Sequence, residues 1–89
     1  MIHDVVAVKA NPDFSLDLNF ANGEWRRFDM QPLLAMKPWS RIDLVRDFPR
    51  VQALHGTVVW PGDLDVAPET LYLDSTPLLP QPDSARSAA

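Results

Sequence analysis

Three acidic side chains lie close together in the sequence and are the best-placed group for chemistry. Asp63, Asp65 and Glu69 occur within one short stretch, and carboxylate oxygens are the ligands that hard cations prefer. A calcium loop needs more ligands and a glycine inside the loop, whereas Gly62 precedes the two aspartates. The spacing favours a simpler role at the start of a helix, where carboxylates interact with free N–H groups and the helix dipole. A metal-dependent enzyme that uses Asp63 and Asp65 stays open as an alternative.

No other residues form a recognisable catalytic group. The sequence has two histidines, and we expect both His3 near the terminus and His55 before Gly56 to be exposed to solvent. The three glycines do not form a phosphate-binding loop, and no serine or threonine occurs in a nucleophile motif. Cysteine is absent, which excludes disulfides and Cys-ligated metal sites. We therefore expect no catalytic residue, no cofactor, no bound metal and no enzymatic activity.

The three tryptophans are candidates for core or interface positions. Trp25 is expected in the core. Trp60 is expected to be mainly a core residue, but its place at a strand end before Pro61 favours partial exposure. An exposed tryptophan is typical of an interaction hot spot. The predicted interaction surface consists of Trp60, Asp63, Asp65, Trp39 and Arg41.

Charge is unevenly distributed along the chain, which has a net charge of −4. Residues 37–50 carry four basic side chains, whereas residues 63–74 carry four acidic side chains and no basic one. The basic residues of the first segment are Lys37, Arg41, Arg46 and Arg50. Patches of opposite sign are typical of solvated faces, and they also favour self-association. The net negative charge disfavours binding to a phosphate backbone, so a nucleic-acid-associated role for residues 37–50 is an alternative only.

The N-terminal residues lack the basic and apolar regions of a secretory signal. No apolar run reaches the roughly 18–20 residues of a membrane span. The absence of cysteine is typical of a reducing compartment. We therefore expect a cytoplasmic protein that does not interact with a membrane.

The first part of the chain predicts three consecutive strands. Residues 3–9 are rich in valine and end at a turn sequence. In residues 14–20, large apolar side chains alternate strictly with polar ones, which is typical of a half-buried strand. Asn22-Gly23 then predicts a two-residue hairpin turn into a third strand at residues 24–29.

The two-residue turn fixes a register for this hairpin. It places Phe20 opposite Trp25 on the core face, as a cross-strand aromatic pair. It also places Asp17 diagonally from Arg26 on the other face. Phe28 does not fit this register, and a strand end or a bulge just before it would explain the mismatch.

Two short helices are expected in the middle of the chain. Residues 31–36, with Pro32 near the start, predict one helical turn. Ser40 is expected to cap a second helix that ends before Pro49. The apolar residues of this second helix would line one face, and they are Ile42, Val45 and Phe48.

The last elements complete an α+β fold. Residues 51–54 and 57–60 predict a hairpin at His55-Gly56, and Pro68–Tyr72 predicts a last short helix. We therefore expect a small antiparallel, hairpin-rich β-sheet with short helices packed on one side. The domain is expected to cover residues 1–74, because residues 75–89 are rich in proline, serine and alanine and are expected to form a disordered tail.

Several of these motifs occur in an order that resembles a known bacterial family, the domain of unknown function 2442 (DUF2442). The resemblance covers roughly residues 3–73. The pieces that carry it are Leu16–Glu24, Phe28-Asp29, Pro32–Leu34, Val58–Gly62, Asp63–Asp65 and Pro68–Tyr72. It implies a small α+β fold with no established activity and no agreed catalytic residues. Ala67 departs from the family, which often has a capping residue before the proline.

The resemblance also bears on the partners. Some family members resemble fusions to a helix-turn-helix domain, but residues 75–89 are too few for one, which argues against DNA binding. Other members are encoded beside small proteins in arrangements similar to toxin–antitoxin pairs. We therefore expect a non-catalytic protein-interaction module, antitoxin-like or self-associating. Its partner would be the product of an adjacent gene or a second copy of the chain.

Overall fold

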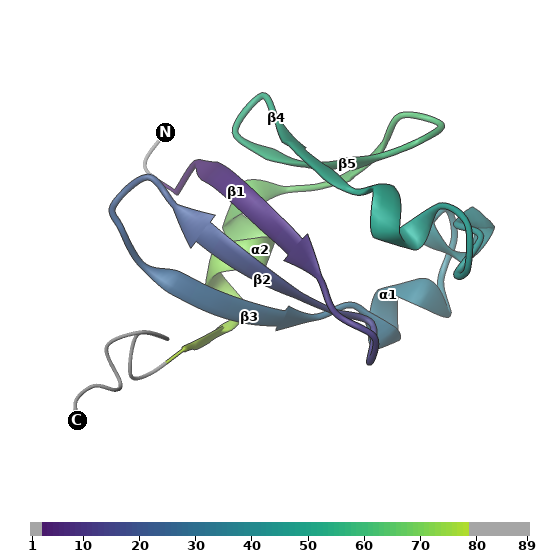
Figure 1. Cartoon of the computed structure of the whole chain (residues 1–89), viewed down its shortest axis with the longest axis horizontal. Coiled ribbons are helices and arrows are strands. Elements are labelled where there is room, and N and C mark those ends of the chain that lie inside the picture. The colour runs from purple at the N-terminus through teal and green to yellow at the C-terminus, as the bar shows by residue number, and fades with distance from the viewer. Residues whose placement is uncertain (1–2, 79–89) are drawn as a thin grey trace.

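The computed structural model describes residues 3–78 and confirms the α+β class. Its strands form two antiparallel sheets rather than one (Figure 1). The first sheet has the order β1-β2-β3-β7 and the second has the order β4-β5-β6. In chain order the elements are β1 (Val5–Ala10), β2 (Ser15–Phe20), β3 (Trp25–Asp29), α1 (Gln31–Leu34), the 3₁₀ turns η1 (Trp39–Arg41) and η2 (Phe48–Arg50), β4 (Gln52–Leu54), β5 (Thr57–Trp60), β6 (Leu64–Val66), α2 (Pro68–Leu73) and β7 (Thr76–Pro77).

The β2–β3 hairpin turns at Asn22-Gly23 as predicted, but its register differs by one residue. Gly23 has a positive φ of 93°, whereas Asn22 does not. The N–H of Phe20 donates to the carbonyl of Glu24 at 2.9 Å, which closes a three-residue loop. Such a loop is typical of a type I turn followed by a left-handed glycine. Trp25 therefore lies opposite Asn19, and the predicted pairing of Phe20 with Trp25 on one face is wrong.

The shifted register changes the side chains that β3 directs to each face. Arg26 now lies opposite Leu18 on the core side, and Phe28 lies opposite Leu16, where it is buried. Arg27, rather than Arg26, faces Asp17. The mismatch of Phe28 is thus resolved by the register of the whole hairpin, with no bulge in β3.

The single helix expected over residues 40–48 is also wrong, because two separate 3₁₀ turns form there. Asp43, and not Ser40, provides the capping side chain: its Oδ1 accepts hydrogen bonds from the N–H groups of Val45 at 3.0 Å and Arg46 at 2.9 Å. These are the bonds of an N-cap, and they begin a separate turn in which the N–H of Asp47 donates to the carbonyl of Asp43 at 2.8 Å. As a result Ile42 is buried, but Val45 is 88 % exposed instead of sharing its face.

The β4–β5 hairpin forms at the predicted His55-Gly56 turn. Both turn residues have positive φ, 54° and 79°, and Leu54 pairs with Thr57. The two sheets meet here, because the N–H of Val5 in β1 donates to the carbonyl of Gly56 at 2.9 Å. Figure 1 shows the β4–β5 hairpin beside β1.

One apolar core lies between the two sheets and α2. The helix α2 begins at Pro68 as predicted and lies behind the four-stranded sheet in Figure 1. Its Leu71 is fully buried. Ala67 provides no capping side chain. The buried apolar residues are Val5, Leu16, Leu18, Phe20, Phe28, Met30, Ile42, Phe48, Val58, Trp60, Val66 and Leu71.

Some residues assigned to the tail contribute to the fold. Ser75 is buried, and β7 pairs with β3 through Thr76 opposite Arg27. Residues 79–89, the rest of the expected tail, lie outside the described residues. Within residues 3–78, no helix combines the length and the apolar character needed to cross a membrane.

Candidate functional site

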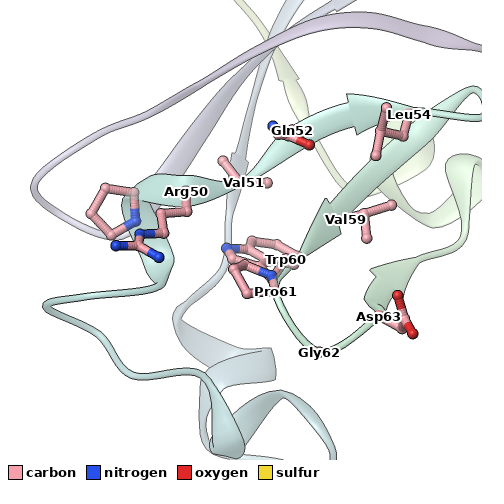
Figure 2. Close-up of a pocket in the computed structure, with 10 residues that line it drawn as sticks. Arg50, Val51, Gln52, Leu54, Val59, Trp60, Pro61, Gly62 and Asp63 are labelled. Atoms are coloured by element: carbon pink, nitrogen blue, oxygen red, sulfur yellow. The ribbon is translucent and has the colours of Figure 1, made fainter.

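A groove of about 590 Å³ lies along the outer side of the β4–β5 hairpin, and we call it the Trp60 groove. Figure 2 shows Trp60 and Pro61 in its middle, with Arg50 on one side and Asp63 on the other. Leu54 contributes an exposed apolar side chain from the edge strand. The lining residues are Pro49, Arg50, Val51, Gln52, Leu54, Val59, Trp60, Pro61, Gly62 and Asp63.

A second groove of about 350 Å³ lies on the other side of η2, and we call it the Phe14 groove. It is lined by Ala10, Asn11, Pro12, Phe14, Leu44, Phe48 and Pro49. Pro49 lines both grooves, so the two hollows meet at η2. The lining of the Phe14 groove is almost entirely apolar, and Asn11 contributes its amide side chain.

The structure brings together some residues of the predicted interaction surface. Trp60 is only 1 % exposed, and its indole N–H donates to the carbonyl of Phe48 at 3.1 Å, so its expected partial exposure is corrected to burial. Trp39 is half-buried, and its N–H donates to the carbonyl of Asp65 at 2.9 Å. Asp63 lines the Trp60 groove and has a positive φ of 63°.

Arg41 and the other residues of the basic segment are exposed on and around the 3₁₀ turns. Arg46 forms an ion pair with Asp47 at 2.9 Å, which lowers the pKa of the Asp47 carboxyl and raises the pKa of Arg46. Arg50 lines the Trp60 groove instead. The basic side chains therefore have different surroundings.

The sequence is similar to a family of known proteins. It matches a family over residues 5–77, and that family is described as "Protein of unknown function (DUF2442)". The chain belongs to the DUF2442 family. No curated protein and no solved structure matches it.

The acidic residues of this DUF2442 chain do not form a metal-binding cluster. Asp63, Asp65 and Glu69 are all exposed. In the part of the chain that the structure describes, no three or more histidine, cysteine, aspartate or glutamate side chains are placed to hold one metal ion. Two of the three acidic residues have other local roles, because Asp63 lines the groove and Glu69 lies in the first turn of α2.

The DUF2442 chain also contains a polar and aromatic cluster that the sequence reasoning missed. The hydroxyl of Tyr72 donates to Glu24, and the guanidinium of Arg26 lies 4.4 Å from the centre of the Tyr72 ring. Arg26 also donates to the hydroxyl of Ser75 at 2.7 Å and to its carbonyl at 2.9 Å. His3 stacks on Tyr72 with ring centres 3.8 Å apart. We call these residues, His3, Glu24, Arg26, Tyr72 and Ser75, the Tyr72 cluster.

The electrostatics of the Tyr72 cluster favour cohesion over proton transfer. The hydrogen bond from Tyr72 lowers the pKa of the Glu24 carboxyl, and the same bond raises the pKa of Tyr72. Both pKa values move away from neutrality, whereas a general acid or base needs a pKa near the working pH. A signal for this cluster was present in the sequence, because Glu24 and Tyr72 each end one of the motif pieces quoted above. Spacing alone could not show that they touch.

Proposed function

We propose that this DUF2442 protein is a non-catalytic protein-interaction module of the bacterial cytoplasm. It binds its partner, a second copy of itself or, like an antitoxin, the product of an adjacent gene, through the Trp60 groove. The observation that carries the proposal is the groove itself, an open hollow of mixed polar and apolar lining in which Arg50 and Asp63 lie on opposite sides.

The chemistry of the Trp60 groove suits a protein ligand. Val51, Leu54 and Val59 supply apolar contact area along it, and burial of such area drives most protein association. Arg50 and Asp63 flank the floor on opposite sides in Figure 2. Charges at a rim orient a partner and raise its association rate more than its affinity. A segment with an apolar side chain between an acidic and a basic residue is the ligand that fits.

The rigid surroundings of the groove also support binding. Two contacts with Phe48 hold Trp60 in place. Its indole N–H donates to the Phe48 carbonyl, and the two rings stack with their centres 6.0 Å apart. A groove floor that is already ordered lowers the entropy cost of association. Nucleic-acid binding is not proposed, because Arg46 is already ion-paired and the chain is acidic overall.

Substitution of Leu54 tests the proposal. Leu54 is 42 % exposed on the edge strand β4, so Leu54→Asp places a charge in the groove without opening the core. The matched control is Leu73→Asp, because Leu73 is 72 % exposed on α2 and does not line the groove. Each variant is assayed for self-association by light scattering and for binding to the co-expressed product of the adjacent gene.

We expect Leu54→Asp to weaken the complex at least about tenfold, which corresponds to about 1.4 kcal/mol, and Leu73→Asp to leave it unchanged. Equal loss in both variants would show that the groove is not the binding surface. A wild-type chain that is monomeric and does not bind the neighbouring product would refute the proposed function.

A further inference from the structure

We propose that the Phe14 groove binds the proline-rich segment 79–82, Leu-Pro-Gln-Pro, of a second copy of this chain. The inference rests on the proposed function in one respect only, namely that the protein binds proteins. The Phe14 groove shares only Pro49 with the Trp60 groove, and its proposed ligand is this one segment.

The walls of the Phe14 groove resemble the surfaces that recognise proline-rich peptides. The rings of Phe14 and Phe48 meet edge to face, with centres 5.3 Å apart and planes at 85°. Leu44 and two prolines complete the apolar lining. Prolines in an extended, left-handed helix dock into aromatic-lined grooves, because the peptide is already ordered and loses little entropy on binding.

The backbone holds Phe14 in an unusual conformation that places its ring in the groove wall. Its φ is 67°, in the left-handed region that bulky residues rarely adopt. The N–H of Phe14 donates to the carbonyl of Asn11, and its carbonyl accepts from the N–H of Met30, both at 3.0 Å. These bonds fix the residue at the turn between β1 and β2. Strain of this kind concentrates at functional positions, which supports a binding role for the groove.

The segment that directly follows Leu78 has the matching composition. Leu79-Pro80-Gln81-Pro82 combines one large apolar side chain with two prolines in four positions. Proline fixes φ near the value of the extended left-handed helix, and in general it restricts the residue before it to extended conformations. The groove offers this ligand the partly exposed ring of Phe14 and the exposed side chains of Pro12, Leu44 and Pro49, whereas Phe48 is only 2 % exposed and packs behind the Phe14 ring.

The direction of the chain favours the groove of a second copy over its own. β7 is antiparallel to β3, with Thr76 opposite Arg27 and Pro77 opposite Arg26. The N–H of Leu78 then donates to the carbonyl of Trp25 at 2.9 Å. Phe14 lies beyond the other end of β3, where Asp29 pairs with Ser15. β7 therefore runs away from the Phe14 groove of its own chain.

Two substitutions in the full-length chain test the groove and the segment separately. Leu44→Asp charges the groove wall, and the control Val45→Asp places the same charge on the neighbouring residue, which is 88 % exposed and does not line the groove. The double substitution Pro80→Ser and Pro82→Ser alters the segment and lies outside residues 3–78. Self-association is measured by analytical ultracentrifugation, and circular dichroism checks that each variant is folded.

We expect the dimer dissociation constant to rise at least about tenfold in the Leu44→Asp chain and in the double proline variant, and to stay unchanged in the Val45→Asp chain. Mixing the first two variants should restore one contact per dimer, because one chain retains the segment and the other retains the groove. The inference is overturned if the double proline variant associates like the wild type, if mixing restores nothing, or if the wild-type chain is monomeric. A monomer that still binds the neighbouring product through Leu54 would overturn this inference while leaving the proposed function intact.

Discussion

At one end of the molecule Arg26 and Tyr72 are surrounded by partners from their own chain, whereas at the other end Leu44 and Pro49 face solvent. Arg26 bonds both polar groups of Ser75 and covers the Tyr72 ring, and its side chain is only 12 % exposed. Around η2, by contrast, two grooves meet at Pro49 beside exposed apolar side chains.

The difference separates residues that hold the fold together from residues that are available to bind. Arg26, Tyr72 and Ser75 already make hydrogen bonds within the chain, so a ligand that used these groups would have to break those bonds. The exposed apolar side chains that line the grooves near η2 make no hydrogen bonds, so a partner can cover them without breaking any bond within the chain. An exposed apolar patch beside a groove is typical of an interaction site. We therefore propose that the Tyr72 cluster serves cohesion and that the grooves around η2 serve recognition.

The largest effect is expected at the residue that anchors the η2 end to the core. Ile42 is 6 % exposed and belongs to the buried cluster. Ile42→Ala should lower the free energy of unfolding by about 2–5 kcal/mol, through lost burial and the cavity that remains. Urea denaturation at neutral pH measures this change. A cost below about 1 kcal/mol would mean that the segment between η1 and η2 is not anchored, and the grooves would then lack a fixed wall.

The next effect distinguishes two neighbouring arginines on β3. Arg26→Ala removes two hydrogen bonds to Ser75 and the contact with the Tyr72 ring, so it should cost about 2–3 kcal/mol. Arg27→Ala is the matched control, because Arg27 makes an ion pair with Asp17 at 2.7 Å on a side chain that is 46 % exposed. Exposed ion pairs contribute less than about 1 kcal/mol. Equal costs would contradict the register and the cohesive role of the cluster.

The same pair of arginines shows what local sequence patterns can and cannot predict. Alternating apolar residues located β2, and Asn22-Gly23 located its turn. The choice between a two-residue and a three-residue loop depends on whether Asn22 also takes a positive φ, which the dipeptide does not determine. Because side chains alternate with a period of two, a shift of one residue in the pairing exchanges the faces of Arg26 and Arg27.

The candidate grooves were predictable only in part, because local sequence patterns do not show which distant segments meet in the fold. Asp63 and Trp60 were selected from the sequence, and both line the Trp60 groove. The spacing of Ile42, Val45 and Phe48 favoured one helix, but the side chain of Asp43 caps a new turn within it, and the segment forms separate short turns instead. The Phe14 groove could not be predicted, because its walls come from distant segments that only the tertiary fold brings together.

A smaller, pH-dependent effect is expected from Glu24 in the Tyr72 cluster. Hydrogen bonds from Tyr72 and Asn22 lower the pKa of its carboxyl below the usual 4.5. A group with a lowered pKa stabilises the fold above its unfolded-state pKa, and this contribution is lost as the pH falls through the folded-state value. The wild type should therefore exceed Glu24→Gln in stability at neutral pH, and the difference should shrink below pH 4.5.

The Tyr72→Phe background provides the control for this pH dependence. Without the tyrosine hydroxyl, the largest cause of the lowered Glu24 pKa is removed, so the effect of Glu24→Gln should vary less with pH. Urea midpoints measured from about pH 7 to about pH 3 for the four chains of this cycle separate the contribution of the hydroxyl. The same pH dependence in both backgrounds would contradict the hydrogen bond between the two side chains.

The smallest change in the free energy of unfolding is expected at Val45. This residue gives the simplest test of the contrast between the Tyr72 cluster and the segment around η2. With 88 % of the residue exposed, Val45 buries almost no apolar area in the folded chain. Val45→Ser should therefore change the free energy of unfolding by less than about 0.5 kcal/mol, as is usual for surface substitutions. The denaturation experiment that measures Ile42→Ala measures this variant too, at a protein concentration low enough for the monomer. A loss above about 1 kcal/mol would show that Val45 packs against its own chain, and the η2 end would then serve cohesion as the Tyr72 cluster does.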